Sequence, residues 1–247
     1  MGTAPSFGAG AYAAALAMVG TSNGLIALLA SIAAGCALGL VVGFASLRVR
    51  SDFLAVTTIG VNFLFTGFVR KQAWLGGEMG ISGIPPTGLG ATGNMAMILA
   101  FAFATILFSL YVDRSWMGFA FRAVGEDESA ATTLGIDSRA YKLAAFGIGT
   151  AFAGLAGGLY AFFTQFITAD AFDFILSVTL MAMVVIGGIG STLGVVVAAI
   201  GLTLLPEVIR FVNDYRLLVY GGLLVLVIRV APGGLAGVVR KLFARAS

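Results

Sequence analysis

The chain has 247 residues, of which 60% are hydrophobic and 10% are charged, and its formal net charge is +3. A soluble domain is about half apolar and about a quarter charged, so this composition excludes an ordinary soluble protein and indicates one that lies in a membrane. With no histidine and a single cysteine the chain lacks most catalytic and metal-site chemistry, so we expect neither a catalytic nor a metal-binding residue.

Long apolar runs separated by short charged clusters predict an all-α fold, a polytopic transmembrane helical bundle of about seven to eight spans in one domain, 1–247. A helix needs about 20 residues to cross the hydrocarbon core, and these runs are too continuous for barrel strands. An apolar piece near 7–20 is short for a complete first helix. The glycines between 187 and 194 leave open whether two short spans or one broken, re-entrant element lie there. The predicted spans are 24–47, 52–69, 95–113, 141–166, 174–190, 192–206 and 215–228.

The basic residues predict the orientation of these spans. If 174–206 counts as two spans, most Lys and Arg residues fall on one side, which the positive-inside rule makes the cytoplasm. The loop at about 114–140 and the C-terminal tail are then inside, and the Gly- and Pro-rich loop at about 70–94 is outside. This topology, rather than nucleic-acid binding, explains the basic excess. The outer loop is either a solvated connector or a docking surface.

Glycines and polar residues within the spans give two further predictions. The glycines recur at every fourth residue, a spacing that lets helices approach closely, so we predict helix packing rather than ligand contact for Gly35, Gly39, Gly43, Gly154 and Gly158. Polar residues inside spans are candidates for the translocation pathway, although they also bond their own helix or a neighbour. The candidates are Thr57, Thr58, Asn62 and Gln165.

The inner loop contains the densest charge of the chain. Glu126, Asp127 and Glu128 are consecutive, and acids complement the positive end of a helix. We predict a helix of about two turns that begins with these acids and is bracketed by Gly125 and Gly135. A helix this short is marginally stable in water, so it must pack either on its own membrane domain or on a partner. The charges favour a partner. Asp137 or Ser138 caps the next span, and one apolar face precedes the acids, formed by Trp116, Phe119, Ala120, Ala123 and Val124.

This loop resembles the cytoplasmic loop of permease subunits in ATP-binding-cassette importers, especially the M-type subunit for branched-chain amino acids. Those subunits carry a Glu-Ala-Ala-x-x-x-Gly-like segment, and here Ala130, Ala131 and Gly135 keep its spacing. Ser129 stands where the general motif has Glu, with Glu128 one place earlier. The form Arg-Ala-x-x-Glu-Asp-Glu-x-Ala-Ala-x-x-Leu-Gly-Ile is typical of the branched-chain branch.

The resemblance covers nearly the whole chain. Segments 141–160, 183–191, 215–221 and 232–235 also look like the family, although Val195 replaces an expected Pro. The family-like motif at 7–12 normally follows a full first helix, which we expect this chain to lack.

The resemblance implies an inner-membrane permease subunit with its C-terminus in the cytoplasm, which moves branched-chain amino acids or similar small polar solutes. Its implied partners are a second permease subunit, two cytoplasmic ATPase subunits, an external solute-binding protein and the lipid bilayer. The chain has no Gly-x-x-x-x-Gly-Lys-Ser/Thr phosphate loop, so we expect a separate subunit to hydrolyse ATP and this chain to be neither an enzyme nor the holder of a cofactor. The alternative is an ion-coupled secondary transporter or a channel subunit. The residues implied to couple to the ATPase are Arg122, Glu126, Asp127, Glu128, Ala130, Ala131 and Gly135.

Overall fold

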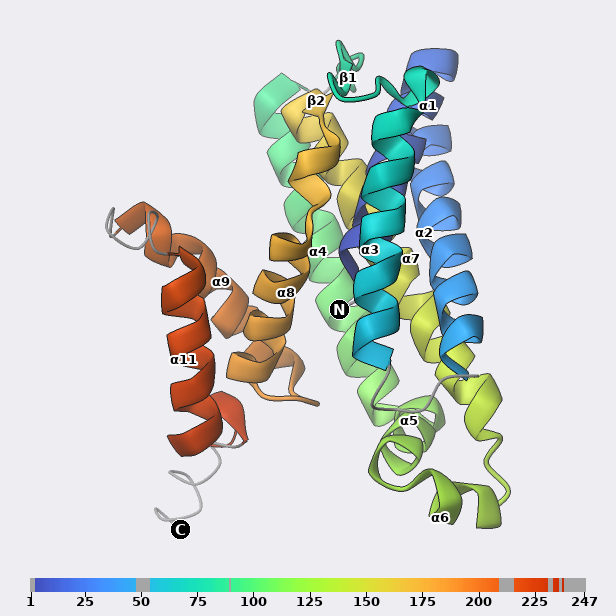
Figure 1. Cartoon of the computed structure of the whole chain (residues 1–247), viewed down its shortest axis with the longest axis vertical. Coiled ribbons are helices and arrows are strands. Elements are labelled where there is room, and N and C mark those ends of the chain that lie inside the picture. The colour runs from blue at the N-terminus through green and yellow to red at the C-terminus, as the bar shows by residue number, and fades with distance from the viewer. Residues whose placement is uncertain are drawn as a thin grey trace. The chain divides into compact units, whose positions relative to one another are not determined.

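The computed structural model describes residues 3–47, 54–88, 90–208, 216–230, 233–235 and 237, and the chain divides into two compact units, Met1–Phe174 and Ile175–Ser247. Within the described residues, the helices of the second unit are α8 (Phe174–Gly187), which starts on the last residue of the first unit, α9 (Thr192–Val208) and α11 (Arg216–Val230). The first unit contains α1 (Thr3–Thr21), α2 (Gly24–Leu47), α3 (Leu54–Lys71), η2 (Ala73–Leu75), β1 (Ile81–Ser82), α4 (Gly90–Arg114), α5 (Trp116–Glu126), α6 (Glu128–Thr133), α7 (Ser138–Thr164), β2 (Phe166–Ile167) and η3 (Ala169–Phe172) (Figure 1).

The predicted all-α, polytopic membrane fold is confirmed. In the part of the chain that the structure describes, four segments are long and apolar enough to cross a membrane: Gly24–Ala45, Gly90–Arg114, Ser138–Thr164 and Ala169–Gly187. The region 174–206 forms two separate helices, α8 and α9, joined by a turn in which the amide of Ser191 donates to the carbonyl of Gly188. The total of seven to eight spans stays a prediction, because residues 52–53, 215 and the C-terminal tail lie outside the described residues.

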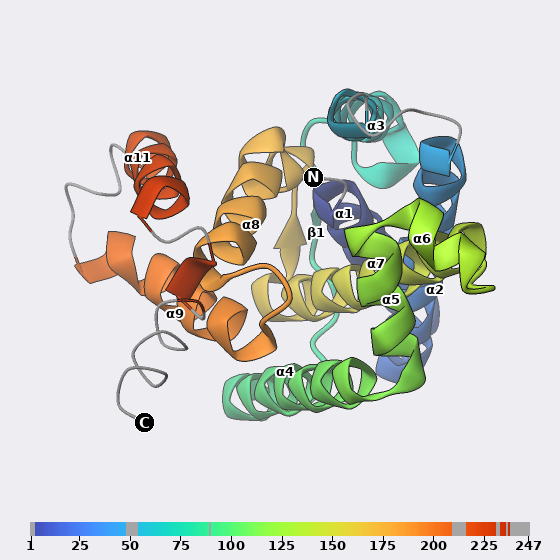
Figure 2. The same ribbon diagram turned by 90° about the horizontal axis from the view of Figure 1, so that it is seen from below.

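The first helix is longer than predicted. Instead of a short apolar piece near 7–20, α1 runs for 19 residues, and ten of them are buried. Alanine and glycine make this helix only moderately apolar, but their small side chains let it pack closely against α7. The carbonyl of Phe7 lies against Gly157, and Gly10 lies against Gly154. Helix α1 is therefore a central element of the first unit, where it packs beside α2 and α7 (Figure 2).

The regularly spaced glycines lie where α2 meets α7. A Cβ atom added to Gly35 would come within 2.7 Å of the Gly154 Cα, and one added to Gly43 would come within 3.1 Å of the Phe146 Cβ. Gly39 faces Thr150, and a Cβ on Gly158 would lie 2.7 Å from the Ser31 hydroxyl. Real side chains essentially never approach closer than 3.0 Å, so glycine is required where these two helix backbones cross.

Part of the loop at 70–94 packs against the first unit. β1 pairs antiparallel with β2, with Ile81 opposite Ile167. The side chains of Leu75 and Ile84 are buried. Two-residue strands have no hydrophobic period to detect, and their partners are distant in sequence. A docking role for the exposed side of this loop stays a prediction.

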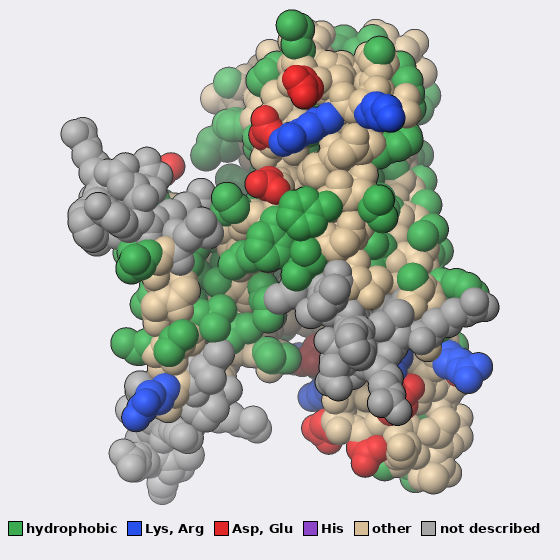
Figure 3. Space-filling model, viewed as in Figure 1, with side chains coloured by type: hydrophobic (Ala, Val, Ile, Leu, Met, Phe, Trp, Pro, Cys, Tyr) green, Lys and Arg blue, Asp and Glu red, His purple; other side chains and the backbone are tan. Residues whose placement is uncertain are grey.

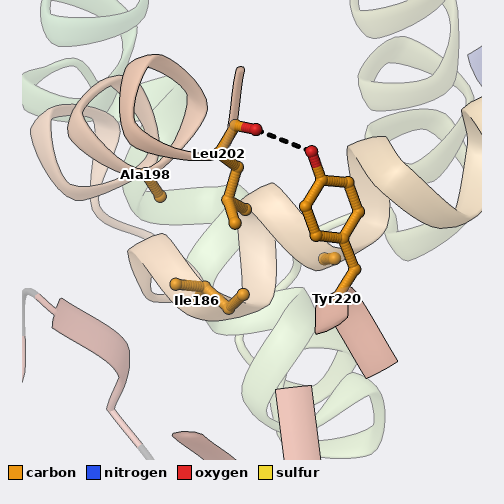
Figure 4. Close-up of a cluster of buried hydrophobic side chains, with 5 residues drawn as sticks. Ile186, Ala198, Leu202 and Tyr220 are labelled. Atoms are coloured by element: carbon orange, nitrogen blue, oxygen red, sulfur yellow. Dashed lines mark hydrogen bonds between the residues drawn. The ribbon is translucent and has the colours of Figure 1, made fainter. Parts of the chain in front are cut away.

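The second unit has its own core, and one of its hydrogen bonds compensates for a proline (Figure 4). Pro206 lies inside α9 and has no N–H, so the carbonyl of Leu202, four residues earlier, loses its usual helical partner. The Tyr220 hydroxyl of α11 donates to that carbonyl at 2.6 Å. Within a membrane an unpaired carbonyl costs several kcal/mol, so this bond stabilises the contact between α9 and α11.

Helix α4 is the most exposed long helix among the described elements. None of the residues in its most apolar window is buried. It touches α7 where the rings of Phe108 and Phe152 lie 5.0 Å apart, centroid to centroid. On the face shown in Figure 3, the acidic and basic side chains of the first unit gather toward its two ends, with hydrophobic side chains between them. This distribution suits a unit whose middle lies in hydrocarbon.

Candidate functional site: the α5–α6 loop and the polar residues of α3

The α5–α6 loop (residues 114–140) lies at the end of the first unit opposite the β1–β2 pair (Figure 1). The break between its helices is at Asp127, which is extended with φ −151° and ψ 109°. One carboxylate oxygen of Asp127 accepts from the amides of Ser129 at 2.8 Å and Ala130 at 3.0 Å. The Asp127 amide donates to the Ala123 carbonyl at 3.1 Å, so this one residue ends α5 and begins α6.

Two details of the predicted helix are therefore wrong. Gly125 does not interrupt the chain but stays helical within α5, and Glu126 is the last residue of α5 rather than the first acid of the new helix. The physical reason is that an aspartate can accept from two free amides at a helix start, whereas a glycine offers only backbone freedom. α6 is correspondingly shorter than predicted, with six residues.

The end of α6 agrees with the prediction that Gly135 stops the helix. Gly135 has φ +82° and its amide donates to the Thr132 carbonyl at 3.0 Å, while the Ile136 amide reaches back to the Ala131 carbonyl at 3.1 Å. These two bonds form a Schellman motif, which satisfies carbonyls that the helix end would otherwise leave free. Asp137, rather than Ser138, then caps α7 by accepting from the amides of Arg139 and Ala140.

A small apolar cluster holds α6 against its own chain. Ala120 of α5, Ala131 of α6 and Ile136 are buried together, and Ala123 and Val124 pack against them. The predicted single apolar face of α5 is therefore divided in two. Ala120, Ala123 and Val124 face α6, whereas Trp116 and Phe119 are exposed. The residues that pack on α6 lie toward the C-terminal end of α5, and the two exposed aromatic residues lie toward its N-terminal end.

Two ion pairs neutralise part of the loop's charge within the chain. Lys142 of α7 pairs with Glu128 at 2.5 Å, and Arg122 contacts Asp113 of α4, with 3.5 Å between the guanidinium and the carboxylate. All four side chains are substantially exposed, so each pair contributes at most about 1 kcal/mol to stability. Their effect is to orient the loop: Arg122 ties α5 to α4, and Glu128 ties α6 to α7.

Part of the loop surface is exposed to solvent. Ala131 is buried, but Ala130 beside it is exposed, as are the acids at 126–128. Leu134 is 75% exposed, the highest value for a large apolar side chain in the loop. The exposure of Leu134, which immediately precedes the capping Gly135, was not predicted from the sequence.

The predicted pathway residues separate into a buried group and an exposed one. Thr58 and Asn62 of α3 are buried, Thr57 is half-buried, and Gln165 is exposed at the C-cap of α7 with φ +54°. With its amide oriented to satisfy both neighbours, Asn62 donates to the Phe172 carbonyl at 3.3 Å and accepts from the Phe174 amide at 2.8 Å. Asn62 thus fastens α3 to the junction between η3 and α8. A pathway role for the four residues stays a prediction.

Replacing Asn62 by leucine tests which role dominates. We expect Asn62→Leu to lower the stability of the protein by about 1–3 kcal/mol, because it leaves the buried Phe172 carbonyl without this donor. Thermal unfolding in detergent measures the change. Thr66→Val is the matched control, since the Thr66 hydroxyl bonds carbonyls of its own helix. Unchanged stability with reduced uptake would instead favour a pathway role for Asn62.

Comparison with known proteins agrees with the resemblance noted from the loop. A family profile described as "Branched-chain amino acid transport system / permease component" matches residues 1–228. The high-affinity branched-chain amino acid transport system permease protein LivM of Escherichia coli (strain K12) is 34% identical over 234 residues, which cover 83% of this chain and 55% of the relative. LivM of Salmonella typhimurium is 33% identical over the same shares.

A third relative is less similar to this chain, and the lengths of the matched proteins differ from its own. The probable branched-chain amino acid transport permease protein LivH of Methanocaldococcus jannaschii is 30% identical over 156 residues, 59% of this chain and 49% of the relative. No solved structure matches the chain significantly. The chain spans about half the length of the curated relatives it matches. Because the profile match covers most of its residues, the chain belongs to the family of branched-chain amino acid transport permeases, and it is an integral membrane protein.

Proposed function

We propose that this chain is the membrane-spanning permease subunit of an ATP-binding-cassette importer, and that it moves branched-chain amino acids or similar small polar solutes across the inner membrane. The observation that carries the proposal is the fixed position and the exposed side of α6. It is a six-residue helix, fixed at both ends by caps and packed on one side, and it presents Ala130 and Leu134 to the solvent. A helix so short is not stable alone, so this chain holds it in a set position for a partner.

The exposed position of α6 and the transport function for which the relatives are named support the proposed partners. An ATPase subunit would bind α6, and its movement on ATP binding would be transmitted through the Glu128–Lys142 contact to α7, which packs against α1 and α2. A second permease subunit, a second ATPase and an external solute-binding protein complete the assembly. This chain would hydrolyse no ATP and hold no cofactor, and its C-terminus would lie in the cytoplasm.

Uptake by membrane vesicles tests the proposed function. Vesicles that contain the full assembly should take up labelled leucine when ATP and the binding protein are supplied, and this uptake should persist when ionophores abolish the ion gradients. ATP-independent uptake that stops with the gradient would instead show an ion-coupled carrier. Passive equilibration that requires neither ATP nor a gradient would show a channel.

A further inference from the structure

Helix α5 has an aromatic surface that the described part of the chain leaves uncovered. Trp116 is 71% exposed and Phe119 is 55% exposed, and their rings stack with centroids 5.6 Å apart. The rest of the same helix face is covered, because Ala120 is buried and Val124 packs against the α6 cluster. Gly118 lies against the backbone at the end of α4. The aromatic pair is thus the uncovered, N-terminal part of the apolar face of α5.

Helix α4 determines where this surface lies relative to the membrane. That helix has 25 residues, and at about 1.5 Å per residue it is longer than the roughly 30 Å hydrocarbon core of a bilayer. Its last residue, Arg114, therefore lies at a membrane surface. Only Ser115 separates Arg114 from α5, and the extended backbone of Ser115 (ψ 167°) turns α5 away from the α4 axis. Trp116 is consequently held at the boundary between hydrocarbon and water.

The chemistry around the pair fits that boundary. Tyr111, on α4 within two turns of Trp116, is 73% exposed, so aromatic side chains continue across the break between the helices. Tryptophan and tyrosine are enriched where lipid headgroups meet the acyl chains, and arginine can extend toward the phosphates from the same depth. Arg114 and Arg122, both exposed, flank the aromatic pair in the sequence. The nearest acid, Asp113, is paired with Arg122, and the acids at 126–128 come at and beyond the far end of α5.

We propose that α5 is an interfacial helix, whose Trp116 and Phe119 insert into the headgroup region of the bilayer on the side of the α5–α6 loop. A lipid surface is the occupant because the pair adjoins a membrane-spanning helix directly, and because its charged neighbours, Arg114, Arg122 and Asp113, are together net basic. Insertion would set the depth of α5, and through the Ala120–Ala131 packing it would also set the depth of α6. This anchoring does not depend on what the protein transports.

The two tryptophans of the chain make the proposal measurable. Trp74→Phe leaves Trp116 as the tryptophan of this chain, and the full-length variant can be reconstituted in phosphatidylcholine vesicles. We expect Trp116 fluorescence to be shifted to the blue and to be reduced roughly twofold by lipids brominated near the headgroup. Lipids brominated near the chain end should quench it less, and aqueous iodide should quench it little.

A second variant separates insertion from general burial. Phe119→Ser in the same background should weaken quenching by the headgroup-brominated lipids, with an unchanged unfolding temperature because Phe119 is exposed. Strong quenching of Trp116 by iodide would overturn the proposal by placing the residue in water. Lipid-independent fluorescence that changes only when ATPase subunits are added would also overturn it, because a protein would then cover the pair.

Discussion

Gly154→Leu is expected to prevent the first unit from folding. The backbone of Gly154 touches both neighbouring helices, because Gly10 of α1 lies against it on one side and the Cα of Gly35 would be 2.9 Å from an added Cβ on the other. A leucine has no space on either side, and overpacking of a close helix contact costs about 3 kcal/mol or more. We therefore expect loss of the monodisperse peak in size-exclusion chromatography and of detectable uptake.

Gly149→Leu is the matched control for this prediction. Gly149 lies on the same helix, is exposed, and has no atom within 4 Å of the position of an added Cβ. Leucine also has a higher helix propensity than glycine, by roughly 0.8 kcal/mol, so this variant should fold at least as well as the parent protein. Equal loss of folded protein in both variants would show that replacing a glycine of α7 by leucine is damaging wherever it is made, and would refute the specific contact at Gly154.

The positions of the long helices could be predicted from the sequence because each depends on a local property. An apolar run of sufficient length must pair its backbone internally in lipid, so the runs at 24–47 and 141–166 became α2 and α7 with ends shifted by at most three residues. The length of helix α1 was underestimated because the prediction used only local apolar character. Its alanines and glycines lower its apolar character, and its stability comes from the contact with α7, which no local pattern reveals.

The details of the site depend on distant or competing contacts, and so were less predictable. The three consecutive acids were predicted to begin the short helix together, and only the backbone geometry shows that Asp127 is its cap. The partners of Asn62, at 172 and 174, are about a hundred residues away in sequence, as is the Asp170 that pairs with Arg70. By contrast, Gly135 and Asp137 were predictable, because a helix end and the following helix start need specific residue types within a few positions.

Ala130→Arg is expected to uncouple the permease from its ATPase while leaving its own fold intact. The Ala130 side chain is exposed on α6, and the bond from its amide to Asp127 is made by the backbone, so arginine can be accommodated without disturbing the cap. A bulky charge at the centre of an interface costs about 2 kcal/mol or more of binding free energy, which corresponds to roughly 30-fold weaker association. Co-purification of the ATPase and ATP-driven uptake measure the effect.

Ala91→Arg provides the comparison, because Ala91 is also an exposed alanine in the first turn of a helix, at the opposite end of α4. Both variants should unfold at the temperature of the parent protein, since exposed substitutions change stability by about 0.5 kcal/mol or less. Only Ala130→Arg should lose the ATPase. If Ala130→Arg retains full co-purification and uptake, α6 does not bind the motor, and the caps at Asp127 and Gly135 serve only to close the end of the helical bundle.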